Sequence, residues 1–204
     1  MAQYQIFNTP QLMFSATNSG ALKVVLLGNS GTGKTSILQY QLNSVVNMSN
    51  LPTIGCVYHE VPISLTNEIV TLKVWDTAGQ EIYRSIVPIY VRDASAAILV
   101  YDISDPTSFA SLDQWRSLLL EEQPTNIFVY IVANKIDLDD DYQVNDAAGK
   151  QYSEKINAKF FKVSAIKGDG IAELFNTIAV DLQNKNLCIS KDLLTPKETS
   201  SGCC

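Results

Sequence analysis

The sequence GNSGTGKT, at residues 28–35, combines three glycines with Lys34 and Thr35. An apolar run, LKVVLL at residues 22–27, comes directly before it and is typical of a buried strand. After it, Ile37, Leu38 and Leu42 have the spacing of one face of a helix. Glycines let successive N–H groups of such a loop point inward, and the helix N-terminus adds a partial positive charge. A strand, a glycine-bearing loop and a helix in this order predict a cradle for phosphate groups.

Most residues of this loop are candidates for contact with the phosphates. Lys34 is placed to reach the outer phosphates, and the hydroxyl of Thr35 is placed to ligate Mg²⁺. The candidate nucleotide-binding residues here are Asn29, Ser30, Gly31, Thr32, Gly33, Lys34, Thr35 and Ser36. The alternative, a glycine-rich turn with a solvated lysine, is disfavoured because the flanking elements are those that a phosphate cradle needs.

Composition narrows the class of protein. The chain has 204 residues, 46% of them apolar, which is enough for one domain with tails. Its net charge of −6 argues against nucleic-acid binding, because no basic stripe is available to displace counterions from phosphates. No signal peptide is evident, and no apolar run approaches the roughly 18 residues of a membrane span. Four cysteines without metal-ligand spacing fit a reducing cytosol.

The chain divides into one central domain and two tails. Residues 1–20 are polar without a sustained period and are expected to be a mobile extension. The strands, helices and motifs fall within residues 21–183. Residues 184–204 show no helical or strand period, which predicts a flexible tail ending in Cys203 and Cys204.

A β-hairpin is predicted after the first helix, from alternating residues at 57–65 and again at 69–76. The side chains expected on its inward face are Val57, Val61, Ile63, Leu65, Val70, Leu72 and Val74. Pro62 lacks a backbone N–H, so the first strand is expected at the edge of the sheet. Tyr58 and Trp75 share the outward face, either as a partly exposed patch or covered by another segment.

Two short apolar runs, at residues 96–101 and 127–133, predict strands buried on both faces, and residues 160–163 predict one more strand. A helix is predicted to start at Asp105-Pro106, with Phe109, Leu112, Trp115 and Leu119 at helical spacing. A second helical face is formed by Ile171, Leu174, Phe175, Ile178 and Leu182. This order predicts an α/β fold: a doubly wound, mostly parallel six-stranded sheet with one antiparallel edge strand.

Polar motifs follow four of the predicted strands. Gly28 follows the first strand, Asp76 ends the second strand of the hairpin, and Asn134 and Ser164 follow two later strands. Because ligands of such sheets bind at the carboxyl ends of the strands, these four segments are expected to meet at one rim.

The second motif is WDTAGQE, at residues 75–81. A carboxylate at a strand end beside a phosphate loop suits Asp76 to an outer Mg²⁺ ligand. Gly79 can bring its N–H against a terminal phosphate, and Gln80 can orient an attacking water. An aspartate after a strand is most often a turn residue or a helix cap, so the motif is weak alone.

The third motif is NKID, at residues 134–137. The carboxylate of Asp137 can accept two hydrogen bonds, from N1–H and the 2-amino group of guanine. Adenine offers no such pair of donors, so Asp137 is expected to set a preference for guanine. This interpretation depends on the phosphate loop upstream.

In order and spacing, these motifs resemble the Rab branch of the Ras superfamily of small GTPases. The matching pieces are GNSGTGKT, TIG at 53–55, WDTAGQE, ILVYD at 98–102, NKID, SA at 164–165 and CC at 203–204. The resemblance covers roughly residues 20–183 and the last two positions. It implies a P-loop G domain that hydrolyses GTP, uses Mg²⁺, and recruits effectors to a membrane in vesicular traffic as a GTP/GDP switch.

The resemblance also implies residue roles. Gln80 and Lys34 are expected to be catalytic, and Gly79 to contact the γ-phosphate. The expected metal ligands are Thr35, Thr53 and Asp76. The expected contacts around the base are Asn134, Lys135, Asp137, Ser164, Ala165 and Ile166, with the Ala165 N–H donating to guanine O6.

Several partners are implied in the same way. Tyr58, Trp75 and Tyr90 fall where Rab proteins carry an exposed aromatic triad that effectors bind; ordinary packing of Tyr58 and Trp75 is the compatible alternative. No arginine is placed to act in cis, so an activating protein is expected to supply one. An exchange factor and a GDI-type carrier of prenyl groups are also expected, with a monomeric G domain and no nucleic acid.

The terminal cysteines imply a lipid anchor. A single lipid binds membranes only marginally, and the charges of the tail nearly cancel. Geranylgeranyl groups on both Cys203 and Cys204 are therefore expected, against the alternative of two unmodified thiols. The expected location is the cytoplasm, cycling to the cytosolic face of a Golgi or endosomal membrane.

Two positions depart from the family pattern near the base. Val46 stands twelve residues after Lys34, where most relatives have an aromatic ring against the guanine, and Ile166 stands where a lysine is usual. Losing a ring-to-base contact costs about 1 kcal/mol. We therefore expect nucleotide to dissociate faster from this protein than from typical relatives.

Two other functions remain open from the sequence. One is a nucleotide-loaded scaffold whose cycle is driven mainly by exchange, which the presence of Gly79 and Gln80 disfavours. The other is an ATP-dependent small-molecule kinase on the same loop, which NKID and the lack of a substrate lid disfavour.

Overall fold

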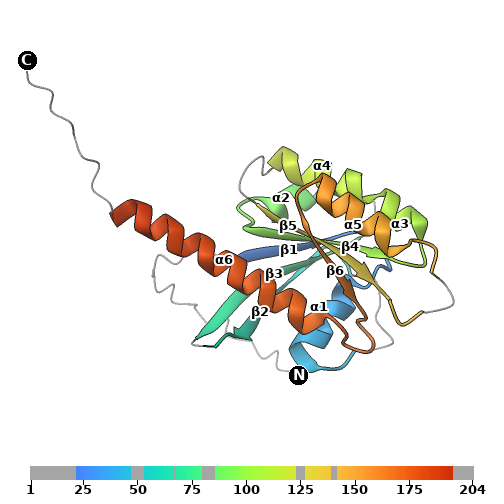
Figure 1. Cartoon of the computed structure of the whole chain (residues 1–204), viewed down its shortest axis with the longest axis horizontal. Helices are drawn as coiled ribbons and strands as arrows, with labels where there is room; N and C mark the ends of the chain where they lie inside the picture. The colour runs from blue at the N-terminus through green and yellow to red at the C-terminus, as the bar shows by residue number, and fades with distance from the viewer. Residues whose placement is uncertain are drawn as a thin grey trace, which may run out of the picture.

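A computed structural model of the chain describes residues 22–46, 53–66, 68–79, 86–122, 127–138 and 142–194, with side chains as far as residue 185. Six strands form one sheet in the order β2-β3-β1-β4-β5-β6 (Figure 1). They are β1 (Lys23–Leu27), β2 (Cys56–Ser64), β3 (Ile69–Thr77), β4 (Ala96–Asp102), β5 (Phe128–Asn134) and β6 (Lys159–Val163). Only the β2–β3 pair is antiparallel. The predicted fold class is confirmed.

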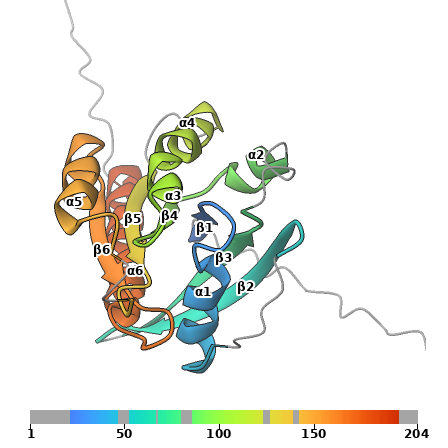
Figure 2. The same ribbon diagram turned by 90° about the vertical axis from the view of Figure 1, so that its right-hand side faces the viewer.

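Helices cover both faces of the sheet. They are α1 (Lys34–Asn43), α2 (Val87–Val91), α3 (Pro106–Ala110), α4 (Leu112–Glu122), α5 (Asp146–Lys155) and α6 (Ile171–Leu194). In Figures 1 and 2, α1 and α6 lie on one face of the sheet and α2 to α5 on the other. Two buried clusters match these layers, with Phe175 of α6 in one and Trp115 of α4 in the other. Every residue of β4 is buried, because both of its faces are covered.

The hairpin of β2 and β3 matches its predicted register with one exception. Val61 and Ile63 are buried against the α6 side, whereas Val57 is 44% exposed, so its predicted inward position is wrong. Val57 pairs with Asp76, at the end of the hairpin farthest from its turn, beyond the residues that pack on α6. Pro62 lies in the edge strand, as predicted.

The single helix predicted after Asp105 is two helices, α3 and α4, separated at Ser111. The side chain of Asp105 caps α3, because its Oδ1 accepts a hydrogen bond from the backbone N–H of Thr107 at 2.9 Å. Pro106 occupies the first helical position, where its missing N–H costs nothing.

The prediction that residues 184–204 lack secondary structure is wrong for residues 184–194, because α6 continues to Leu194. Figure 1 shows this end of α6 extending past the edge of the sheet. No glycine or proline interrupts the sequence between Ile171 and Leu194, and each added helical residue costs little once a helix is nucleated. The termini of the chain, residues 1–21 and 195–204, lie outside the described residues.

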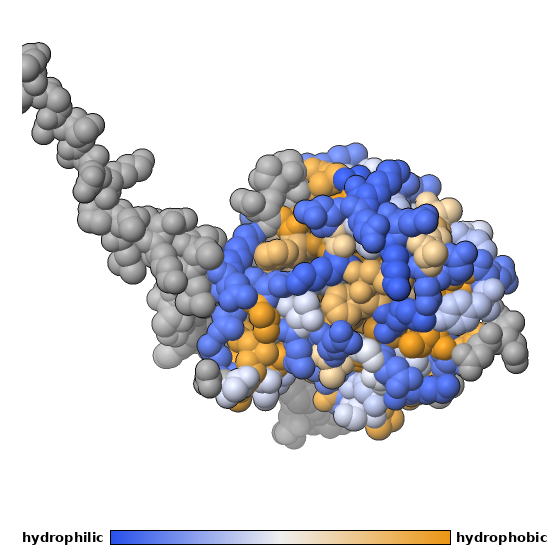
Figure 3. All heavy atoms as spheres, viewed as in Figure 1, coloured by the Kyte–Doolittle hydropathy of each residue, from blue (hydrophilic) through white to orange (hydrophobic). Residues whose placement is uncertain are grey.

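The surface is mixed in character. On the face seen in Figure 3, apolar residues are separated by polar ones. Within the described residues, no helix combines the length and apolar character needed to cross a bilayer.

Candidate functional site

The phosphate loop connects β1 to α1 and encloses the side chain of Lys34. The Nζ atom of Lys34 donates hydrogen bonds to the backbone oxygens of Gly28 at 2.8 Å and Asn29 at 2.9 Å, and the residue is 5% exposed. Gly33, the N-cap of α1, has φ +92°, and a Cβ there would lie 2.2 Å from Asn134 Nδ2. Only glycine fits this position, which brings the loop against the end of β5.

Burial changes the proton affinity of this lysine. Desolvation lowers the pKa of Lys34 to about 8, partly offset by the negative charge of Asp76. A positive charge held in a poorly solvated place is attracted strongly to an incoming anion, because little water screens it. The loop is therefore suited to bind phosphate.

Three oxygen-bearing side chains gather beside the loop. Thr35 Oγ1 donates to Asp76 Oδ2 at 2.6 Å and lies 2.9 Å from Thr53 Oγ1. Asp76 Oδ1 is buried without a hydrogen-bond partner in the described structure, and burial raises the pKa of Asp76 despite the hydrogen bond from Thr35. Two hydroxyls and a carboxylate with an unsatisfied oxygen are hard donors, and they fit Mg²⁺.

Gly79 follows β3 at the point where the backbone approaches the phosphate loop most closely. A Cβ at this position would lie 2.4 Å from the carbonyl carbon of Asn29 and 2.5 Å from Lys34 Nζ. A side chain larger than hydrogen would displace the loop or the lysine. The neighbouring Gln80 lies outside the described residues.

The NKID motif connects the phosphate loop to the end of β6. Asn134 Nδ2 donates to Thr32 O at 2.8 Å, and Asn134 Oδ1 accepts from Ala165 N at 3.2 Å. Ser164 Oγ donates to Asp137 Oδ1 at 2.5 Å. The structure thus brings together the segments that the sequence predicted to meet. The N–H of Ala165 already has an acceptor, so the predicted bond to guanine O6 competes with Asn134.

The remaining residues predicted to lie near the base are partly exposed. Ile166 is 48% exposed, and Val46 is half-buried beyond the end of α1. Ser30 and Gly31 are exposed at the tip of the phosphate loop, whereas Thr32 is buried.

Sequence reasoning gave no role to Asp102, the last residue of β4. Its Oδ2 lies 2.5 Å from Lys135 Nζ, and its Oδ1 accepts from the backbone N–H and hydroxyl of Ser104. Lys135 has φ 69°, a left-handed conformation that is uncommon outside glycine. Asp102 therefore helps to fix Lys135. Its position at the carboxyl end of a strand is the feature of the sequence from which a role in the site could have been predicted.

The side chain of Asn29 does not face the loop interior. It hydrogen-bonds Ser111, between α3 and α4, and Trp115 of α4. If Asn29 contacts nucleotide as predicted, it does so through its backbone, because its side chain is bonded to Ser111 and Trp115.

Tyr58 and Trp75 form a pair on the outer part of the hairpin. They are directly opposite in the β2–β3 register, with ring centroids 4.7 Å apart. Tyr58 is 44% exposed, and Trp75 is half-buried with Lys23 Nζ 4.8 Å from its ring centroid. Tyr90 is on α2, and among the described residues it makes no ring contact with either. Both sequence interpretations, packing and partial exposure, therefore apply to the pair.

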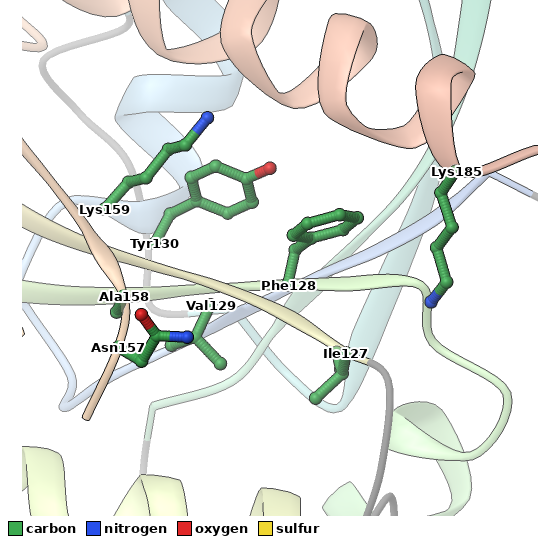
Figure 4. A pocket seen from close by; sticks show the side chains of 8 residues that line it. All are labelled: Ile127, Phe128, Val129, Tyr130, Asn157, Ala158, Lys159 and Lys185. Carbon is green, nitrogen blue, oxygen red and sulfur yellow. The ribbon is translucent and has the colours of Figure 1, made fainter. Parts of the chain in front are cut away.

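A pocket of about 510 Å³ lies elsewhere, at the amino end of β5 between α6 and the start of β6 (Figure 4). It is lined by Ile127, Phe128, Val129, Tyr130, Asn157, Ala158, Lys159 and Lys185. Lys159 is paired with Asp181, and none of the three motifs reaches this end of the strand. The three motifs thus lie at the opposite ends of the strands from this pocket.

The fold and the arrangement of its motifs define a P-loop nucleotide-binding domain. The profile of the Ras family matches residues 23–184. Mouse "Ras-related protein Rab-17" is 38% identical over 180 residues, 87% of this chain and 83% of that protein. Dog "Ras-related protein Rab-22A" and rat "Ras-related protein Rab-31" are each 39% identical over 158 residues, 78% of this chain and 81% of theirs.

The chain belongs to the Ras family and is a small GTPase of the Rab type. It hydrolyses GTP and acts as a switch in membrane trafficking, and its family typically requires an activating protein.

Proposed function

We propose that the rim described above binds GTP with Mg²⁺ and that its individual residues have the roles set out below. The observation that carries this proposal is the convergence of Lys34, Thr35, Asp76, Asn134 and Asp137 from distant segments. They lie at or just after the carboxyl ends of β1, β3 and β5, and these three strand ends are on the same side of the sheet.

At the phosphate end, Lys34 neutralises charge on the outer phosphates. Its ammonium already has two acceptors in the loop and is shielded from water. A donor fixed in this way stabilises charge that develops during phosphoryl transfer without having to reorganise. The backbone N–H groups of residues 30–36 complete the cradle.

Thr35, Thr53 and Asp76 hold Mg²⁺, which supplies charge neutralisation at the phosphates. The fit rests on the unsatisfied oxygen of Asp76 and on the two hydroxyls beside it. Thr53 lies in the segment before β2 and Gly79 in the segment after β3, so both segments contact the end of the nucleotide that changes on hydrolysis.

Gln80 orients the attacking water, and the activating protein supplies an arginine that stabilises the transition state. At the other end, Asp137 accepts from the guanine, Ser164 fixes the carboxylate, and Lys135 is fixed by Asp102.

Outside the site, Tyr58 and Trp75 form the centre of the surface that effectors bind, with Tyr90 at its border. Geranylgeranyl groups on Cys203 and Cys204 attach the chain to the cytosolic face of an endomembrane. An exchange factor and a GDI-type carrier complete the cycle.

A nucleotide assay tests the proposal. Purified protein with Mg²⁺ should bind a fluorescent GTP analogue that unlabelled GTP displaces and ATP does not. In single-turnover hydrolysis, Gln80→Ala should be slower by about 10²-fold, while the matched control Gln114→Ala, exposed on α4, should keep the wild-type rate. Equal displacement by ATP, or hydrolysis unaffected by Gln80→Ala, would refute these assignments.

A further inference from the structure

The side chain of Asn29 is held by α4. Its Nδ2 donates to Ser111 Oγ at 3.0 Å, and its Oδ1 accepts from Trp115 Nε1 at 2.9 Å. An indole nitrogen can only donate, so the amide oxygen must face Trp115 and the amide nitrogen must face Ser111. Ser111 Oγ donates to Thr107 O at 2.8 Å, which leaves its lone pairs for Asn29. The donors and acceptors of this group are thus matched.

The backbone of the same residue supports the phosphate loop. Asn29 O accepts from Lys34 Nζ at 2.9 Å and from Thr32 Oγ1 at 3.0 Å. Gly79 packs against the carbonyl carbon of Asn29, so closely that a Cβ there would lie within 2.4 Å. One residue therefore connects α4, through its side chain, with the lysine of the loop, through its carbonyl.

Trp115 provides the fixed point of this connection. Its side chain is 1% exposed and belongs to the buried cluster between the sheet and α2 to α5. A close-packed core holds an aromatic ring in one position. A buried N–H without an acceptor is costly, so the packing of the indole determines where the amide of Asn29 lies.

We propose that Asn29, Ser111 and Trp115 form a clamp that positions the phosphate loop for the β-phosphate, with Asn29 as a positioning residue. The proposal rests on the proposed function, because it assumes that the loop binds phosphates. Without the clamp, the Asn29 carbonyl no longer lies in a fixed place, and Lys34 loses one of its two orienting acceptors. Contacts to the β-phosphate weaken, whereas the contact of Asp137 with the base does not change, because Asp137 is held by Ser164 and not by the loop.

A comparison of GDP with GMP tests this. GMP has the same base and ribose but lacks the β-phosphate, so a change confined to the loop alters the ratio of the two dissociation constants. Asn29→Ala and Trp115→Phe should each bind GDP about tenfold more weakly and GMP within about twofold of wild type. The double variant should bind GDP no more weakly than either single variant, since both remove the same interaction.

The matched control is Tyr152→Phe, which removes a hydrogen bond of 3.0 Å from Tyr152 to Asp113 elsewhere on α4. It should leave both dissociation constants unchanged. Ser111→Ala, a smaller change at the α3–α4 junction, carries the test if Trp115→Phe fails to fold.

Three outcomes would overturn the clamp. GDP and GMP weakened equally would indicate a general structural effect, additive losses in the double variant would show independent sites, and unchanged GDP binding in folded variants would show no effect on the loop. A wild-type protein that binds neither nucleotide would overturn the proposed function as well, which distinguishes the two failures.

Discussion

The phosphate end of the site is enclosed, whereas part of its base end is open to solvent. At the phosphate end, Lys34 is buried and hydrogen-bonded twice, and Thr35 is bonded to Asp76. At the base end, Ile166 is half-exposed and Val46 offers no ring. From this difference we expect affinity to come mainly from the enclosed polar groups, where water screens least, and the rate of nucleotide release to depend on the open end.

The strongest way to break this contrast is to remove the charge at the phosphate end. Lys34→Met should weaken GDP binding by about two to three orders of magnitude, because the phosphates lose a buried, charge-assisted partner. Titration calorimetry measures the change. Lys150→Met, at an exposed position of α5, should keep wild-type affinity. A loss below tenfold for Lys34→Met would contradict the contrast.

The base end should matter for selectivity. Asp137→Asn should reduce the preference for GDP over ADP by about 10- to 100-fold, since the amide presents one acceptor and one donor to two guanine donors. Competition against a fluorescent nucleotide gives the ratio. Glu173→Gln, exposed on α6, is the matched control. An unchanged ratio would mean that Asp137 does not contact the base.

Proton uptake offers a direct test of the buried lysine. Burial lowers the pKa of Lys34 to about 8 without nucleotide, and a bound phosphate raises it. Below pH 8 the lysine is charged in both states, so this group adds no pH dependence. Above pH 8 binding must take up a proton, and GDP affinity should fall by up to about tenfold per pH unit until the pKa of the complex is reached.

The measurement is calorimetry between about pH 7 and 9.5 in buffers of different ionisation enthalpy, which counts the protons. Burial raises the pKa of the nearby Cys56 to about 12, so this thiol stays protonated across the range. Binding without proton uptake at about pH 9 would contradict the lowered pKa of Lys34.

The smallest effect is expected from adding a ring at the open base end. Val46→Phe should slow release of a fluorescent GDP analogue several-fold, because a ring packed against the base contributes about 1 kcal/mol. Val45→Phe, at an exposed neighbouring position, is the control. Release from Val46→Phe that is unchanged or faster would contradict the prediction that Val46 speeds nucleotide release.

The sequence was a good guide where local spacing decides the structure. Period-2 and apolar runs located the six strands, and the phosphate loop was placed by the strand and helix beside it. Helix α5 was not predicted from the sequence. Gly149 and Ser153 are among its buried residues, so it has no apolar face that periodicity could reveal. The exposure of Val57 depends on where α6 ends its contact with the sheet, which alternation in one strand cannot show.

Long-range pairing was not accessible from the sequence. Asp102 meets Lys135, and Asn29 meets Trp115, only because neighbouring strands and α4 bring them together. The motif assigned Asn29 to the ligand because it lies in the loop, but tertiary contacts directed its side chain elsewhere. Motif membership thus predicts where a residue lies more securely than what its side chain contacts.

The length of α6 limits the distance that residues 184–204 can span from the G domain. Had residues 184–204 been a free tether, they would have reached up to about 70 Å. As helix, residues 184–194 span only about 16 Å in a defined direction, which leaves residues 195–204 with at most about 35 Å. The helix is rigid, so with the proposed lipid anchor the orientation of the domain at a membrane would depend on the direction in which α6 leaves the domain.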